Sequence, residues 1–400
     1  MKVSYNPLDP AVLQDPYPHY AQLRNEAPVA WIEQMNGYAV SRYDDQVTVL
    51  SDPGTYSSAK FWPVLLGEYD PVPEVPPMIS LDPPAHLRIR KLANKAFIPR
   101  NIAHLDGKMR EVANQLIDEI LARHGREGEF DLVWEFNALF PVSVVADVLG
   151  VDLARRMDFK HWVDDLLSAG NRAAYDSERL AKIRKSSDDI RAYFEELYDR
   201  RAAAPGADLI SSFILADVDG EHLSRSEVMN LAILLLIGGV ETTTNLLGIT
   251  FAVLHQHPAI ARQVRDDLAR IPALFQEVLR YDPPVQMVFR HTTHETTLAG
   301  VTVPENALML LLLASANRDE TRFKHPNIFD IERPAENFMS FGAGPHYCLG
   351  NYLARKEAHV GLEVLFERFS SIELVSEDIV WMDSYFARGP KSLPVRFRAR

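Results

Sequence analysis

The 400-residue chain contains only one cysteine, Cys348. A single thiol excludes an intramolecular disulfide, and it also excludes zinc and iron–sulfur sites that need several cysteine ligands. If sulfur takes part in the chemistry of this protein, Cys348 must provide it.

Positive charge is also scarce, because 42 Lys and Arg residues stand against 55 Asp and Glu residues, for a formal net charge of −13. Proteins that bind nucleic acids need a basic surface to contact phosphates. We therefore expect no nucleic-acid partner. The net negative charge should help to keep the protein in solution.

Long hydrophobic runs are missing as well. The most apolar stretches, residues 231–237 and 307–314, are far shorter than the roughly 20 residues that cross a bilayer. The N-terminal segment lacks the basic start and apolar core of a secretory signal. We expect a cytoplasmic protein without a membrane anchor, and a monomer.

The chain does contain ample material for a large core, with 47% hydrophobic and 24% charged residues. It has no Gly/Ser-rich linker, charge block or internal repeat, so we predict a single domain over residues 1–400. From His86 to about Asp267 the apolar residues follow a mostly helical spacing, with breaks near residues 125–128, 150 and 205–206.

Short strands are predicted at residues 29–34 and 38–42, on either side of an Asn36-Gly37 pair that is typical of a tight hairpin turn. Another β region is expected at 296–303, and a helix after Cys348 that runs towards Phe369. Seven prolines between residues 59 and 84 disfavour helix and indicate a long shaped loop. The predicted class is mainly α with minor β.

One glycine-rich run leads to the cysteine and then to the start of a helix. It reads Phe341-Gly342-Ala343-Gly344-Pro345-His346-Tyr347-Cys348-Leu349-Gly350. Glycines at 344 and 350 would let the backbone approach a flat cofactor, and a helix N-terminus stabilises a thiolate. A lone cysteine is more often a small buried apolar residue. That alternative does not explain the spaced Phe, Gly, His, Cys and Gly, which indicate an iron-ligating thiolate.

This run resembles the haem loop of the cytochrome P450 family, F-x-x-G-x-H/R-x-C-x-G, at every defined position, and further motifs extend the resemblance over nearly the whole chain. The resemblance implies a single triangular haem domain with a long central helix and small sheets. It also implies haem b (iron protoporphyrin IX), with Cys348 as the axial ligand. Other residues that it places against the haem are Phe341, Gly342, Gly350 and Gly238.

A long helix is predicted from Ser224, where Ser224 and Glu227 form a capping box, to a point before Pro258. Gly238 and Gly239 lie in its middle, where each glycine weakens a helix by about 1 kcal/mol relative to alanine. Close helix packing is one explanation. The resemblance gives another, a site above the haem where Thr242 hydrogen-bonds O2 and Glu241 relays protons.

The same resemblance assigns roles to charged side chains elsewhere in the chain. Read alone, Glu277 and Arg280 would be a surface ion pair, which contributes little to stability; the family instead has a buried structural pair, completed here by Arg333. Two buried propionates would be costly to desolvate without cations nearby. The residues that match the family's propionate contacts are His86, Arg90, Arg290 and His346.

The resemblance places mostly apolar side chains in the pocket over the haem, which favours a lipophilic substrate of polyketide, terpenoid, steroid or fatty acyl type. The family positions are Leu234, Ile237, Gln286, Val288 and Phe386, with Phe61, Trp62 and Leu65 as lid residues of the proline-rich loop. The expected activity is that of a haem-thiolate monooxygenase, of the kind used in secondary metabolism. It would insert one atom of O2 by hydroxylation or epoxidation.

The chain has no flavin or iron–sulfur module, so electrons from NAD(P)H would arrive through a separate ferredoxin and ferredoxin reductase. Arg88, Lys91 and Lys95 share one helical face that could dock an acidic ferredoxin, or they could form an ordinary solvated basic face.

Other classes of function remain open at this stage. A haem-thiolate protein can be an isomerase, a peroxygenase or a gas sensor, although the Glu241-Thr242 pair favours oxygen activation. A haem-free helical binding protein is a further alternative. His255 and His257, like His291 and His294, have spacings that could suit a metal but lack a convincing set of further ligands.

Overall fold

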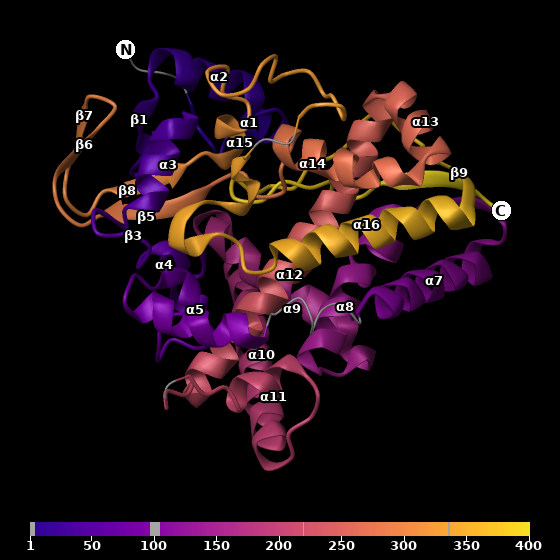
Figure 1. Cartoon of the computed structure of the whole chain (residues 1–400), viewed down its shortest axis with the longest axis horizontal. Helices are drawn as coiled ribbons and strands as arrows, with labels where there is room; N and C mark the ends of the chain where they lie inside the picture. Colours follow the sequence, from indigo (N-terminus) through magenta and orange to yellow (C-terminus); the bar gives the residue numbers. More distant parts are fainter. Residues whose placement is uncertain (1–4, 97–104, 219, 335–336) are drawn as a thin grey trace. The chain divides into compact units, whose positions relative to one another are not determined.

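The computed structural model describes residues 5–96, 105–218, 220–334 and 337–400. Contacts between Cα atoms divide the chain into two compact units. Unit 1 comprises residues 1–57, 113–137 and 242–400, and unit 2 comprises residues 58–112 and 138–241. Both units are therefore assembled from segments that lie far apart in the sequence. Figure 1 labels most of the elements named below.

Unit 1 contains helices and all of the named strands of the described chain. Its helices are α1 (Pro10–Gln14), α2 (Tyr17–Glu26), α3 (Tyr43–Ser51), α13 (Pro258–Asp266), α14 (Ile271–Tyr281), α15 (Leu313–Ala316) and α16 (Asn351–Arg368). Its strands are β1 (Val29–Ile32), β2 (Gly37–Val40), β3 (Tyr56–Ser57), β4 (Glu127–Asp131), β5 (Val288–Thr292), β6 (Thr296–Leu298), β7 (Val301–Val303), β8 (Leu308–Leu311), β9 (Phe369–Leu374) and β10 (Pro394–Ala399).

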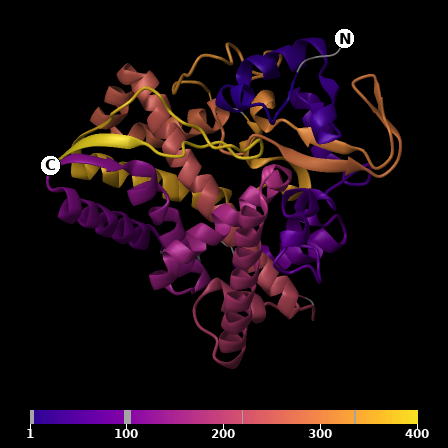
Figure 2. The ribbon, with the colours of Figure 1, turned by 180° about the vertical axis from the view of Figure 1, so that it is seen from behind.

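The strands form a five-stranded sheet in the order β1-β2-β8-β5-β3, a three-stranded sheet β4-β10-β9, and the hairpin β6-β7. In the large sheet β2 and β8 are parallel, and the other neighbouring pairs are antiparallel. Figure 2 shows the yellow C-terminal strands of the smaller sheet beside β4. The expected β region at 296–303 is confirmed as β6 and β7.

The Asn36-Gly37 pair does form a turn, but each residue has a different role there. Asn36 adopts the left-handed conformation with a φ of 48°. Gly37 begins β2, and a Cβ atom at this position would lie 2.9 Å from the carbonyl oxygen of Leu308 on the neighbouring β8. The glycine is thus needed for close strand packing rather than for its φ angle.

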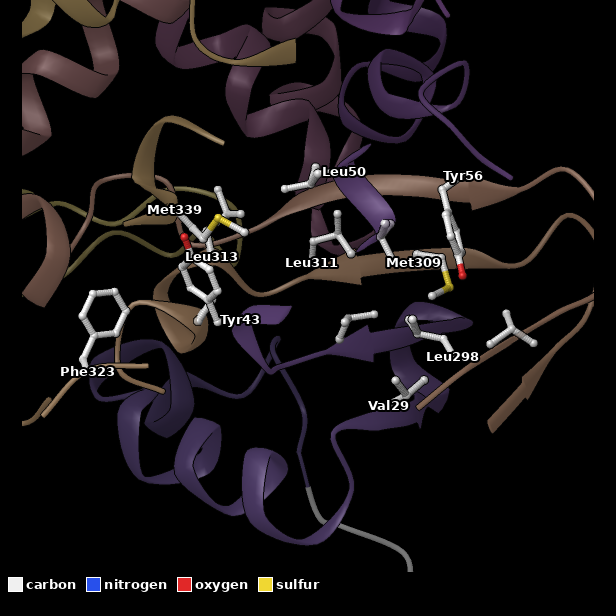
Figure 3. Packing of buried hydrophobic residues seen from close by; sticks show 14 residues of the cluster. Val29, Tyr43, Leu50, Tyr56, Leu298, Met309, Leu311, Leu313, Phe323 and Met339 are labelled. Carbon is white, nitrogen blue, oxygen red and sulfur yellow. The ribbon is translucent and has the colours of Figure 1, made fainter. Parts of the chain in front are cut away.

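The large sheet carries a core of buried apolar side chains (Figure 3). Strand residues such as Met309 and Leu311 are fully buried, and they pack with Tyr43 and Leu50 of α3. Each large apolar side chain removed from water stabilises the fold by roughly 1.5–3 kcal/mol. This core holds α3 on the sheet.

Unit 2 contains helices α4 (Phe61–Leu65), α5 (Ala85–Ala96), α8 (Leu139–Leu149), α9 (Arg156–Ser168), α10 (Ser177–Ala203) and α11 (Leu209–Ile214). Two long helices, α7 (Leu105–His124) and α12 (Arg225–Gln256), run through the boundary between the units. The short α4 lies within the segment that we expected to be a loop. Pro63 occupies the first turn of α4, where a proline is tolerated because its missing N–H would have no helical partner.

The capping box at the start of α12 is confirmed. The Ser224 amide donates to the Glu227 carboxylate at 2.7 Å, and the Glu227 amide donates to the Ser224 hydroxyl at 3.3 Å. By length and composition α12 could cross a membrane, but 72% of its most apolar window is buried inside the protein. That degree of burial is also typical of the core helix of a soluble protein.

Candidate active site

Cys348 lies at the end of a tightly folded loop. Gly342 and Gly344 have φ angles of 71° and 66°, which turn the chain back on itself. The amide of Cys348 donates to the carbonyl of Phe341 at 2.9 Å, and the Asn351 side chain donates to the Cys348 carbonyl at 3.0 Å. Helix α16 begins at Asn351, so the half-buried thiol is held just before a helix N-terminus, where a thiolate is stabilised.

The two glycines that we expected to approach a cofactor have different surroundings. A Cβ atom on Gly344 would overlap the carbonyl group of Leu50, the penultimate residue of α3. A Cβ atom on Gly350 would meet nothing within 4 Å. Gly344 therefore lets the loop pack against α3, and only Gly350 borders open space.

Helix α12 presents one open stripe in a mostly buried stretch. Leu234 and Thr242 are half-buried and Gly238 is exposed, whereas Ile237 and Glu241 are buried. The open residues are four positions apart, so they share one side of the helix. A Cβ atom on Gly238 would meet nothing within 4 Å.

The neighbouring Gly239 has a separate purpose. A Cβ atom at this position would lie 2.9 Å from Cγ2 of Val145 on α8, which is closer than real contacts allow. The sequence offered close helix packing and an open site as alternatives for the glycine pair. Gly239 fits the first of these and Gly238 fits the second.

Glu241 belongs to a buried charge cluster that the sequence did not reveal. The ammonium of Lys160 on α9 lies 2.9 Å from Oε2 of Glu241, and it is also paired with Asp164 one helical turn further on. Lys160 and Glu241 are only 5% and 3% exposed. The i, i+4 spacing of Lys160 and Asp164 was a visible signal, but Glu241 lies 81 residues away.

The pKa values in this cluster follow from one cation being shared by two carboxylates. Burial and the nearby Glu241 raise the pKa of Asp164 to about 7, against the opposing effect of Lys160. Burial works against the charged form of Lys160, but the two carboxylates outweigh it and raise the lysine pKa. The cluster can therefore hold a proton near neutral pH.

Glu277 and Arg280 are a buried pair, not the surface pair that the spacing alone would suggest. The Arg280 guanidinium donates two hydrogen bonds to Glu277, at 2.7 and 2.8 Å, and both side chains are at most 3% exposed. Arg333 completes the set at 3.3 Å. Arg280 also donates to the carbonyls of Asn317 and Pro326, so the pair joins α14 to the segment before the cysteine loop.

The four expected propionate contacts are divided between the two units. His86 is fully buried and Arg90 is half-buried, one turn apart on α5 in unit 2. In unit 1 Arg290 is buried on β5, and its guanidinium donates to the Phe289 carbonyl at 2.6 Å. His346 is half-buried in the cysteine loop.

The expected pocket residues differ in their exposure. Leu234, Val288 and Phe386 are half-buried, and Phe386 stacks on Phe289 with ring centroids 6.1 Å apart. Gln286 is buried, and its side chain donates to the Pro283 carbonyl at 2.8 Å. The remaining residues are packed with exposures of 5% or less: Phe61, Trp62, Leu65 and Ile237.

The basic face of α5 is partly engaged within unit 2. The Arg88 guanidinium is paired with Glu227, and the Lys95 ammonium donates to the Asp217 carbonyl at 2.8 Å. Among the residues that the structure describes, no group of three or more His, Cys, Asp or Glu residues could hold a metal ion.

Comparisons with known proteins agree with this geometry. A family model described as Cytochrome P450 matches residues 19–392. The solved structure of cytochrome P450 CYP109Q5 from Chondromyces apiculatus has a TM-score of 0.91 to this chain at 37% identity, with all of both chains covered.

Two characterised relatives carry names that describe a reaction. Cyclomarin C epoxidase CymV of Salinispora arenicola is 35% identical, with 90% of each chain covered. The 6-deoxyerythronolide B hydroxylase of Saccharopolyspora erythraea is 32% identical, with 96% of each chain covered. Together with the cysteine loop, these matches show that the chain belongs to the cytochrome P450 monooxygenase family.

Proposed function

We propose that this monooxygenase inserts one atom of O2 into a lipophilic small molecule, by hydroxylation or epoxidation. The observation that carries the proposal is the half-buried thiol of Cys348, held before a helix N-terminus in the family's glycine-rich loop. The named relatives act as an epoxidase and a hydroxylase. A polyketide, terpenoid, steroid or fatty acyl substrate fits the apolar side chains expected at the site.

The residues present fit the haem that the family implies. The donor set is a single thiolate, which is the ligand that haem-thiolate enzymes require. Open space at Gly350 and Gly238 leaves room beside the loop and beside α12. Cys348 would hold the iron, and His86, Arg90, Arg290 and His346 would neutralise the propionates. When bound, the haem would supply the activation of O2.

The chain's own residues would control the protons. Thr242 lies on the open stripe of α12, and Glu241 precedes it with one carboxylate oxygen held by Lys160 at 2.9 Å. Lys160 holds the Glu241 carboxylate towards α9, and a proton moved from Asp164 to Glu241 would weaken this hold. Glu241 would then be free to pass a proton to the Thr242 hydroxyl.

Substrate binding would rest mainly on desolvation. The half-buried pocket residues Leu234, Val288 and Phe386 are apolar, and burying apolar surface contributes about 25 cal/mol per Å². With few polar groups to fix the substrate's orientation, the fit of its shape would decide which carbon lies nearest the reacting oxygen.

Electrons would come from NAD(P)H through a separate ferredoxin reductase and ferredoxin, and the enzyme would act as a cytoplasmic monomer. Because Arg88 is paired with the carboxylate of Glu227 within unit 2, the basic face of α5 offers a ferredoxin less positive charge than the sequence suggested. Charge reversal at Lys91 should therefore change the salt dependence of reduction only slightly.

The deciding experiment is the spectrum of the reduced carbon monoxide adduct. A thiolate ligand gives a Soret band at a longer wavelength than that of a histidine-ligated globin, and Cys348→Ala should abolish that band. A spectrum like that of a histidine-ligated globin, or a Cys348→Ala variant with the wild-type spectrum, would contradict the proposal.

Thr242→Ala tests the oxygen-activating step separately. With a substrate found by its low-spin to high-spin shift, we expect this variant to consume electrons without forming an equivalent amount of product. A peroxygenase would instead turn over with hydrogen peroxide alone, and that turnover would not depend on Thr242.

A further inference from the structure

A buried polar cluster joins the N-terminal helices to the segments that carry two of the expected pocket residues. The Tyr17 hydroxyl on α2 donates to Asp282 at 2.5 Å, and the Arg388 guanidinium pairs with the same carboxylate at 3.0 Å. Arg388 also donates to the carbonyls of Leu13 and Gln14, at the end of α1, at 2.9 and 3.1 Å. We call these three side chains the Tyr17–Asp282–Arg388 cluster.

The cluster is largely shielded from water, although Tyr17 itself is half-buried, and many contacts restrain its geometry. The side chains of Asp282 and Arg388 are each 8% exposed. A buried ion pair is stable only when further hydrogen bonds satisfy both partners, as they do here. The guanidinium of Arg388 also lies 3.8 Å from the ring of Trp381, and that of Arg318 lies 3.5 Å from the ring of Tyr17.

Backbone hydrogen bonds connect this cluster directly to the pocket segments. The Arg388 amide donates to the Pro284 carbonyl and the Gln286 amide donates to the Phe386 carbonyl, both at 2.8 Å. Residues 284–286 and 386–388 thus run antiparallel beside one another. Because Phe386 precedes Arg388 by two residues and stacks on Phe289, a shift of the Arg388 backbone must also move the Phe386 ring.

The other side of this segment is closed by α12. A Cβ atom on Gly389 would overlap the Asn245 side chain, and one on Gly248 would lie 2.6 Å from Cγ of Pro390. Residues 389 and 390 are therefore packed against α12, and residues 386–388 pair with residues 284–286. Among the described residues, Asp282 is the only side chain to which Arg388 is recorded to donate a hydrogen bond.

We propose that the Tyr17–Asp282–Arg388 cluster is a positioning element that fixes the Phe386 ring and the Gln286 backbone, and thereby decides which bulky ligands the pocket accepts. The proposal deepens the proposed function and rests on it, because it takes Phe386 and Gln286 as pocket residues. The three side chains do not touch the substrate themselves.

Two ferric-iron ligands of different size test the proposal. Imidazole and clotrimazole both bind iron through an imidazole nitrogen and are followed by the same optical shift, but only clotrimazole carries three aromatic rings that must fit the pocket. Tyr17→Phe and Arg388→Met should weaken clotrimazole binding at least about fivefold and change imidazole binding by less than about twofold. Arg388→Lys, which keeps the charge, should restore part of the clotrimazole affinity.

Arg24→Met is the matched control. Arg24 also lies on α2, is 3% exposed, and is paired with a carboxylate, Glu320, at 2.7 Å. Its contacts are with Glu320 and Ser315 and do not include the 386–388 segment. Both azoles should bind this variant as they bind the wild type. If Arg388→Met does not fold, Tyr17→Phe still tests the proposal, because it keeps both charges.

Hydrogen exchange gives a readout that does not need the haem. Peptides covering residues 283–289 and 384–390 should exchange faster in Tyr17→Phe and Arg388→Met than in Arg24→Met. An unchanged ratio of clotrimazole to imidazole affinity, with or without faster exchange, would overturn the positioning role. A wild-type protein without a Soret band would instead overturn the proposed function.

Discussion

Two buried charge clusters in this protein combine carboxylates and cations in opposite proportion. In unit 1 one carboxylate, Glu277, is shared by the guanidiniums of Arg280 and Arg333. In unit 2 one ammonium, Lys160, is shared by the carboxylates of Asp164 and Glu241. Guanidinium groups do not lose their protons in proteins, whereas a surplus carboxylate can gain one. The second cluster therefore has a member that can titrate near neutral pH, in addition to its structural role.

The largest effect is expected from Glu277→Gln, because it leaves two guanidiniums without their carboxylate. Removing one partner of a buried pair costs about 3–5 kcal/mol of the free energy of unfolding. Urea unfolding followed by circular dichroism measures this loss. Glu332→Gln is the control, since Glu332 is paired with Arg270 but is 72% exposed, and it should change stability by less than about 0.5 kcal/mol.

A smaller loss, about 1–3 kcal/mol, is expected from Lys160→Met. The loss should be smaller because the two remaining carboxyl groups can share a proton, which the guanidinium cluster cannot do. It should also be greater at pH 8 than at pH 6, since holding that proton becomes harder as pH rises. Equal losses at the two pH values would contradict the shared-proton view, and Lys182→Met in the exposed pair with Glu178 serves as the control.

Asp164→Asn should change how steeply the free energy of unfolding falls with pH, more than its value at any one pH. Asp164 has a folded-state pKa of about 7 against an ordinary value of 3.8. Its contribution is complete below about pH 4 and is lost as pH rises through 7, because the unfolded chain gives up the proton first. The variant should lack this decline, which amounts to at most about 1.4 kcal/mol per pH unit. An unaltered slope would place the titration on another group.

The smallest effect is expected from Arg333→Lys, about 1 kcal/mol. The lysine keeps the positive charge beside Glu277 but loses the hydrogen bonds that Arg333 donates to the carbonyls of Lys324, His325 and Ile328. The loss should be the same at pH 6 and pH 8, because guanidinium and ammonium groups both stay protonated in this range. A loss that depends on pH would remove the distinction between the two clusters.

The sequence predicted features that depend on near neighbours. The Ser224 and Glu227 capping box lies within four residues, and the helix after Cys348 follows a regular apolar spacing, so both were found. The sheet of β4, β9 and β10 was missed. It pairs residues 127–131 with residues 394–398, and no local pattern announces a partner so far along the chain.

The candidate site likewise contains residues that could be predicted from the sequence and residues that could not. The cysteine loop and the Glu241-Thr242 pair are continuous motifs, so the resemblance located them. Lys160 and Asp164 belong to another helix, and only the folded chain brings Lys160 to Glu241. The two roles of Gly238 and Gly239 could not be separated either, because the difference depends on Val145 of α8.

The contact between Gly344 and Leu50 gives α3 an influence on the iron ligand. There is no room for even a methyl group between Gly344 and Leu50. The last turn of α3 therefore limits how closely the loop that ends at Cys348 can approach it. Side-chain volume at residue 344, and not charge, should then set how far the sulfur reaches. The large sheet, whose core anchors α3, would in this way help to position the sulfur that Cys348 would offer to the iron.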